Sequence, residues 1–123
     1  MFANVSRLIC VSVLIFGTFV SARAAELIMV EEPGCVWCAR WNTEIGPIYP
    51  KTAEARRAPL RRMDISDVSA SGITFNSRVT FTPTFILVED GQEVIRIEGY
   101  PGEDFFWGLL AEMLKQLPEG SDT

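Results

Sequence analysis

The alternation of apolar and polar residues along the chain predicts four β-strands. Residues 26–31 hold a short apolar run that is typical of a buried strand, and residues 60–65 alternate as a half-buried strand does. Residues 84–89 and 93–98 lie on either side of Asp90-Gly91, and two such segments around an Asp-Gly pair are a strong hairpin signal. The last two strands are therefore expected to pair antiparallel.

Apolar residues at helical spacing predict a helix after the first strand. This helix begins near Val36 and carries an apolar stripe made by Trp37, Trp41, Ile45 and Ile48. The spacing favours a core position for Trp37, and the alternative is that Trp37 packs over Cys38 and restricts access to it. Gly46-Pro47 and Pro50 are expected to end or kink the helix, and residues 51–57 to form a second short helix.

The C-terminal part of the chain predicts a further helix over residues 103–117. Its expected buried face consists of Phe106, Leu110, Met113, Leu114 and Leu117. Residues 66–77 are polar and contain glycine, which indicates a loop with a short helix. The order of elements predicts an α/β fold in which a central mixed sheet is flanked by helices and is followed by a C-terminal hairpin and helix.

The first 24 residues have the pattern of an export signal rather than of a folded segment. Arg7 supplies a positive charge, residues 8–20 are apolar, and Ala22-Arg23-Ala24 supplies the small residues of a cleavage site. The stretch between Arg7 and Arg23 has 15 residues, and a membrane-spanning helix needs ~20. We expect a signal peptide in residues 1–24, cleaved after Ala24, with an uncleaved membrane anchor as the alternative.

Composition restricts the chemistry of the exported part, which we expect to be one domain in residues 25–123. The chain of 123 residues contains no histidine, so a Ser-His or Cys-His nucleophile pair and a zinc site with imidazole ligands are both excluded. Its 16 acidic residues outnumber 11 basic ones, which argues against a nucleic-acid partner because such partners need clustered Lys and Arg.

Two of the three cysteines, Cys35 and Cys38, lie between the first strand and the first helix. A thiol at a helix N-terminus faces unsatisfied N–H groups and the positive end of the helix dipole, and both favour the thiolate. We therefore interpret Cys35 as an exposed nucleophile and Cys38 as the residue that resolves a mixed disulfide. The alternatives are a structural disulfide and a copper or zinc site that uses the same two thiolates.

The chain resembles the thioredoxin family in two motifs. One is Cys35-Val36-Trp37-Cys38 after a first strand, and the other is Phe81-Thr82-Pro83-Thr84 before the hairpin and last helix. The resemblance implies a thioredoxin-like fold, a redox-active disulfide between the two cysteines, and a cis Thr82-Pro83 bond beside it. It also implies that a protein substrate contacts Thr82 and Pro83, together with Val36 and Trp37 between the cysteines.

The sequence departs from the thioredoxin pattern near the two cysteines. Thioredoxins place a buried Asp six residues before the first cysteine, where this chain has Met29, so that proton acceptor is absent. Glu31 or Glu32 could take its place, or both could be ordinary solvated acids. The unusual Val-Trp pair between the cysteines leaves open whether the protein is a reductase, an oxidase or an isomerase.

A closer resemblance is to small exported thioredoxins, the SoxS-like proteins of bacterial sulfur-oxidation clusters. It lies in the segment EEPGCVWCARWNTEIGPIYPKT. It implies a periplasmic reductase, without a cofactor, that keeps a cysteine-bearing carrier protein of sulfur oxidation in its reduced state. Because the periplasm is oxidising, such a protein needs electrons from a membrane donor. We expect a monomer.

Overall fold

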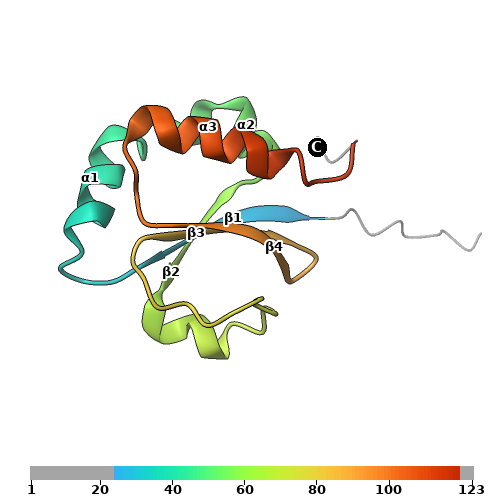
Figure 1. Ribbon diagram of the computed structural model, residues 1–123, viewed down its shortest axis with the longest axis horizontal. Helices are drawn as coiled ribbons and strands as arrows, with labels where there is room; N and C mark the ends of the chain where they lie inside the picture. The colour runs from blue at the N-terminus through green and yellow to red at the C-terminus, as the bar shows by residue number, and fades with distance from the viewer. Residues whose placement is uncertain (1–23, 120–123) are drawn as a thin grey trace, which may run out of the picture.

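The computed structural model describes residues 24–119, in which one sheet is covered by helices (Figure 1). The strands are β1 (Ala25–Glu31), β2 (Leu60–Asp64), β3 (Thr84–Glu89) and β4 (Gln92–Glu98). The α-helices are α1 (Val36–Glu44), α2 (Ala53–Arg57) and α3 (Glu103–Leu114), and the 3₁₀ helices are η1 (Tyr49–Lys51) and η2 (Ile65–Ala70). All four predicted strands are confirmed to within one residue at each end.

The sheet is mixed, as the sequence predicts, with the strand order β2-β1-β3-β4. β1 pairs parallel with β2 and antiparallel with β3, and β3 and β4 form the expected hairpin. Asp90 and Gly91 at its turn have φ angles of 52° and 76°. Asp and Gly adopt this left-handed conformation more readily than most residues, which explains why the pair marks the hairpin.

Alternation along β1 divides the interior into two cores on opposite faces of the sheet. Leu27 and Met29 face the core under the α-helices, whereas Ile28 and Val30 face the other side. The first core is the larger and contains the buried aromatic side chains Trp41, Tyr49, Phe85, Tyr100 and Phe106. The second core is closed by η2 and by the loop that follows it, through Ile65, Val68, Ile73 and Phe75.

The helices flank the sheet unequally, since α1, α2 and α3 lie over one face and η2 lies beneath the other (Figure 1). The predicted buried face of α3 is confirmed: Phe106, Leu110, Met113, Leu114 and Leu117 are all buried. α3 itself ends at Leu114, three residues before the predicted end.

The end of α1 agrees with its predicted stop signal. The backbone N–H groups of Ile45 and Gly46 both donate to the carbonyl of Trp41, at 2.8 and 3.1 Å, which closes the helix. A Cβ on Gly46 would lie 2.7 Å from the carbonyl oxygen of Asn42. Only glycine fits there without a backbone shift, so the chain can turn sharply into Pro47.

The predicted core position of Trp37 is wrong. Trp37 is 52% exposed and Ile48 is 46% exposed, whereas Trp41 and Ile45 are fully buried. α1 is nine residues long and covers the edge of the core with one short stripe. Trp37 lies in the first turn of α1, where its ring contacts the Arg40 guanidinium.

Candidate active site

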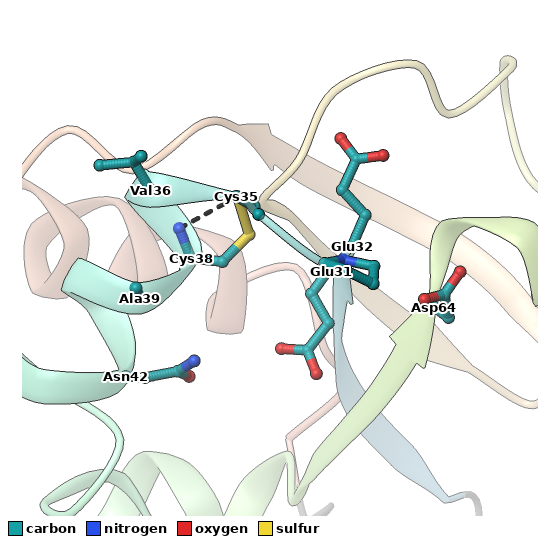
Figure 2. A pocket seen from close by; sticks show the side chains of 10 residues that line it. Glu31, Glu32, Cys35, Val36, Cys38, Ala39, Asn42 and Asp64 are labelled. Carbon is teal, nitrogen blue, oxygen red and sulfur yellow. Dashed lines mark hydrogen bonds between the residues drawn. A yellow bond between two sulfur atoms is a disulfide. The ribbon is translucent and has the colours of Figure 1, made fainter.

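The two cysteines occupy the N-terminus of α1, and a disulfide joins them (Figure 2). Cys35 is the N-cap residue, with extended backbone, and its Sγ accepts a hydrogen bond of 3.1 Å from the backbone N–H of Cys38. Their Cα atoms are 5.2 Å apart. The Cys35 sulfur thus occupies the place of a capping oxygen, where helix N–H groups stabilise negative charge.

The two sulfur-bearing side chains differ in access to solvent. Cys38 is buried with 4% exposure, while Cys35 is half-buried and precedes the exposed residue Val36. The preceding turn ends at Gly34, whose φ of 78° lets the backbone reverse direction immediately before the helix. An incoming group can therefore reach Cys35 more readily than Cys38.

The Thr82-Pro83 segment lies beside the residues that precede the disulfide. Its peptide bond is cis, as the resemblance implies. The Thr82 hydroxyl donates to the Glu32 carboxylate at 2.7 Å, and the Pro83 carbonyl accepts the Gly99 N–H, also at 2.7 Å. The first of these bonds joins the loop before α1 to the loop before β3. Its two residues are 50 positions apart in sequence, so the tertiary fold brings the segment before the cysteines next to Thr82.

Three exposed apolar side chains belong to these two motifs. Val36 is 76% exposed, Trp37 52% and Phe81 58%. The guanidinium of Arg40 lies 5.5 Å from the centre of the Trp37 ring, in cation–π geometry. Sequence analysis did not assign Phe81 a role, although a large apolar residue directly before Thr82, within the quoted motif, was a usable signal.

An open groove of about 590 Å³ lies beside the disulfide. Figure 2 shows the disulfide at its rim, with Glu31 and Glu32 at the end of β1 and Asp64 at the end of β2. The residues that line it are Glu31, Glu32, Pro33, Gly34, Cys35, Val36, Cys38, Ala39, Asn42 and Asp64. The charged side chains that line it are all acidic. Because the groove is open and Cys38 is among its lining residues, solvent can come close to this buried cysteine.

Met29, which stands where thioredoxins have a buried Asp, is fully buried. A guanidinium N–H of Arg62 points at its sulfur at 3.7 Å. The same guanidinium binds Glu31 at 2.6 Å and Asn42 at 2.8 Å. Of the two acids considered as replacements, Glu31 therefore pairs with Arg62, and Glu32 accepts the Thr82 hydroxyl.

Within residues 24–119, no group of three or more Cys, Asp or Glu side chains is arranged to hold a metal. None of the helices in that range is long and apolar enough to span a bilayer. Residues 1–23 of the predicted signal peptide, which include Cys10, lie outside the described residues.

Comparison with solved structures identifies similar folds. The periplasmic thioredoxin SoxS from Paracoccus pantotrophus, in its reduced form, shares 50% sequence identity, with a TM-score of 0.72. The match covers 75% of this chain and 97% of that one. No protein-family model matches the chain, and no match was found among curated proteins.

More distant thioredoxins share the fold. Fasciola hepatica thioredoxin is 19% identical with a TM-score of 0.53, over 73% of this chain and 81% of that one. Malassezia sympodialis thioredoxin (Mala s 13) is 15% identical with a TM-score of 0.52, over 73% and 75%. The parts matched in all three cases leave about a quarter of this chain unmatched.

Proposed function

Because this chain belongs to the thioredoxin family and is a thiol–disulfide oxidoreductase, we propose that it works in the periplasm as a reductase of protein disulfides. The observation that carries the proposal is the Cys35–Cys38 pair at the N-terminus of α1, beside the cis Thr82-Pro83 segment. It combines a nucleophile, a resolving thiol and the half-buried Thr82, while Pro83 itself is buried.

The first step forms a mixed disulfide. In the reduced protein, the Cys35 thiolate attacks one sulfur of the substrate disulfide, and the other substrate sulfur leaves as a thiolate that takes up a proton. The N-cap position supports this role, because the Cys38 N–H that now donates to Cys35 Sγ can also stabilise the thiolate. The half-buried Cys35 is the sulfur that a protein can reach.

The second step resolves the intermediate. Cys38 loses its proton and attacks Cys35 Sγ, which forms the Cys35–Cys38 disulfide and releases the second substrate sulfur as a thiol. Two electrons have then moved from the enzyme to the substrate. The acidic groove beside Cys38 gives the departing proton a route to Glu31, Glu32 or solvent. A membrane protein that supplies two electrons is needed to reduce the enzyme again.

The substrate is a cysteine-containing periplasmic protein that docks on Val36, Trp37, Thr82 and Pro83. The exposure of Val36 and Trp37 supports this, since large apolar side chains at a surface favour protein contacts. Similarity to periplasmic SoxS at 50% identity, together with the signal-like residues 1–24, supports the location. We extend the proposal to a carrier protein of sulfur oxidation as the substrate, and to a monomeric enzyme.

The test is to trap the substrate with Cys38→Ser. Without its resolving thiol, Cys35 should hold its partners as mixed disulfides in periplasmic extracts, visible as higher-mass species on non-reducing gels that disappear on reduction. Cys35→Ser, which removes the nucleophile and keeps Cys38, is the matched control and should trap little. Mass spectrometry of the trapped species would identify the substrate.

Two results would contradict the proposal. Absence of trapped partners together with tight, stoichiometric copper or zinc binding would favour the metal module. A measured reduction potential near that of strong oxidants, about −120 mV, would make the protein an oxidase instead of a reductase.

A further inference from the structure

The loop that leads into the docking segment is fixed to the hairpin by its backbone. In this loop, residues 71–80 connect η2 to Phe81. The Thr74 N–H donates to the Gly91 carbonyl, and the Glu93 N–H donates to the Thr74 carbonyl, each at 2.9 Å. Thr74 also forms an isolated parallel bridge with Gln92. The turn and the start of β4 therefore hold one end of the loop.

A buried ion pair on β4 holds the next part of the loop. The Arg96 guanidinium donates to both Glu93 carboxylate oxygens, at 2.6 Å each. The side chain of Glu93 is only 2% exposed and that of Arg96 11%. Burial by itself raises the pKa of Glu93, but the hydrogen bonds from Arg96 and from the Asn76 N–H outweigh burial, so its pKa lies below the ordinary value. Glu93 is therefore ionised at neutral pH.

The same pair binds the backbone of three consecutive loop residues. Glu93 accepts the Asn76 N–H at 2.8 Å. Arg96 donates to the carbonyls of Ser77, at 2.9 Å, and Arg78, at 3.3 Å. Apolar side chains at these two positions could not make such directional bonds, and burying two charges carries a desolvation cost. The pair therefore fixes where the backbone of residues 76–78 lies.

Only a few residues separate this anchor from the docking segment. Val79 is buried in the second core, and the Phe81 carbonyl accepts the Thr84 hydroxyl at 2.7 Å. The stretch from residue 79 to Thr82 is thus held between the Arg96 anchor and the start of β3. A displacement at residues 76–78 would be passed along this short stretch to the backbone of Thr82.

We propose that Glu93 and Arg96 are positioning residues that set the backbone of residues 80–83 for docking of protein disulfides. This inference rests on the proposed function, because it assumes that protein substrates dock on that segment. The pair touches neither the cysteines nor the substrate. It therefore affects recognition of an extended protein substrate, and leaves the chemistry of the dithiol unchanged.

The experiment measures how fast the reduced, folded wild-type protein and its Arg96→Met variant react with two disulfide substrates. Insulin serves as a protein disulfide that must dock, and Ellman's reagent serves as a small disulfide that needs only the thiolate. We expect the second-order rate constant for insulin to fall about tenfold, while the rate with Ellman's reagent and the reduction potential stay unchanged. Hydrogen exchange at the Gly99 amide, which donates to the Pro83 carbonyl at 2.7 Å, should become faster.

Two further variants keep the test decisive. Arg96→Lys retains the charge but cannot reach both carbonyls and both carboxylate oxygens, so it should fold and show an intermediate loss with insulin. Arg61→Met is the matched control, because Arg61 forms an exposed ion pair of 3.0 Å with Glu26 near the opposite edge of the sheet. It should leave both rates and the exchange unchanged.

The outcomes separate this inference from the proposed function. Unchanged insulin rates and unchanged exchange in both Arg96 variants would overturn the positioning role, as would equal losses with the two disulfides. If the wild-type protein reacts with Ellman's reagent but not with insulin, the proposed reduction of protein disulfides is contradicted. The positioning role, which depends on that function, is then contradicted as well.

Discussion

Trp37 and Trp41 lie one turn apart on α1 but occupy opposite environments. Trp41 is fully buried and packs on Phe85, with ring centroids 5.3 Å apart. Trp37 is half-exposed and contacts the Arg40 guanidinium. The first tryptophan therefore contributes to the surface beside the disulfide, and the second contributes to the core.

This difference predicts opposite effects of truncating the two tryptophans. Trp37→Ala should change the free energy of unfolding by less than about 0.5 kcal/mol and should slow reduction of a protein disulfide, because apolar contact area is lost. Trp41→Ala, the matched comparison, should cost about 3–5 kcal/mol. Urea titration followed by far-ultraviolet circular dichroism measures both. A large loss of stability in Trp37→Ala would contradict the surface role.

Met29 is one residue near the disulfide at which this chain differs from the usual thioredoxin pattern. A buried thioether, against which Arg62 places a guanidinium N–H, stands where the family has a carboxylate. Acidic groups near Cys38 are instead found on the wall of the open groove. Proton transfer from Cys38 would then pass through solvent in that groove and not through the core.

At the scale of elements, Tyr49 fastens the connection between α1 and β2 to its neighbours. Tyr49 in η1 is fully buried, and its hydroxyl donates to the Ala58 carbonyl at 2.6 Å. Its ring stacks on Trp107 of α3, with centroids 6.2 Å apart and an interplanar angle of 8°. Tyr49 thereby ties η1, the end of α2 and α3 together.

Tyr49→Phe tests this link, since it keeps the ring and removes the hydroxyl. We expect a loss of about 1–3 kcal/mol in the free energy of unfolding, because the Ala58 carbonyl would remain buried without its partner. Thr43→Val removes an exposed hydroxyl that donates to the Ala39 carbonyl at 3.1 Å, and it serves as the control. Equal stability of the two variants in urea titrations would show that the Tyr49 bond contributes little.

At the scale of the whole molecule, the two hydrophobic cores on opposite faces of the sheet are covered by different elements. α-Helices cover the first core, which forms the platform for α1 and its disulfide. A 3₁₀ helix and a long loop cover the second, and that loop carries the docking segment. The active site lies where the two layers meet, at the ends of β1 and β2 (Figures 1 and 2).

The ionisable groups of the folded protein predict a broad stability plateau with two limbs. Hydrogen bonds from Arg40 and Tyr100 lower the pKa of Glu44, and Glu93 also has a lowered pKa. A carboxyl with a lowered folded pKa contributes stability that is full above its unfolded pKa, about 4.5, and is lost as pH falls through the folded pKa. Burial raises the pKa of Tyr49 above its ordinary value of 10.0. The stability that this group contributes is lost as pH rises above about 10.

Between these limbs the oxidised protein should be equally stable from about pH 5 to 9, because the chain has no histidine to titrate there. Urea midpoints measured from pH 3 to 11 test this. Glu93→Gln should reduce the fall in urea midpoint at low pH, and Tyr49→Phe should reduce the fall at high pH. A steep change in midpoint near pH 6.5 would contradict the assignment.

The sequence alone determined the elements and the reactive pair. Local signals were sufficient for this: period-two alternation for the strands, Asp90-Gly91 for the hairpin, Gly46-Pro47 for the end of α1, and two cysteines at a helix start for the chemistry. Each depends on residues close together in the chain, so no knowledge of packing was required. The family resemblance supplied Thr82 and Pro83.

Only the tertiary structure decided which residues of the α1 stripe are covered. Periodicity places Trp37 and Trp41 on one stripe. The core rings of Phe85 and Phe106 pack on Trp41, whereas Trp37, one turn nearer the start of α1, is 52% exposed. The partners of Glu32 and Arg62 are 20 to 50 residues away in sequence. Arg96 pairs with the nearby Glu93, but the backbone carbonyls that it also binds lie 18 and 19 residues away, and no local pattern predicts these contacts. Docking and positioning depend on such distant contacts, whereas thiol reactivity depends on one helix end.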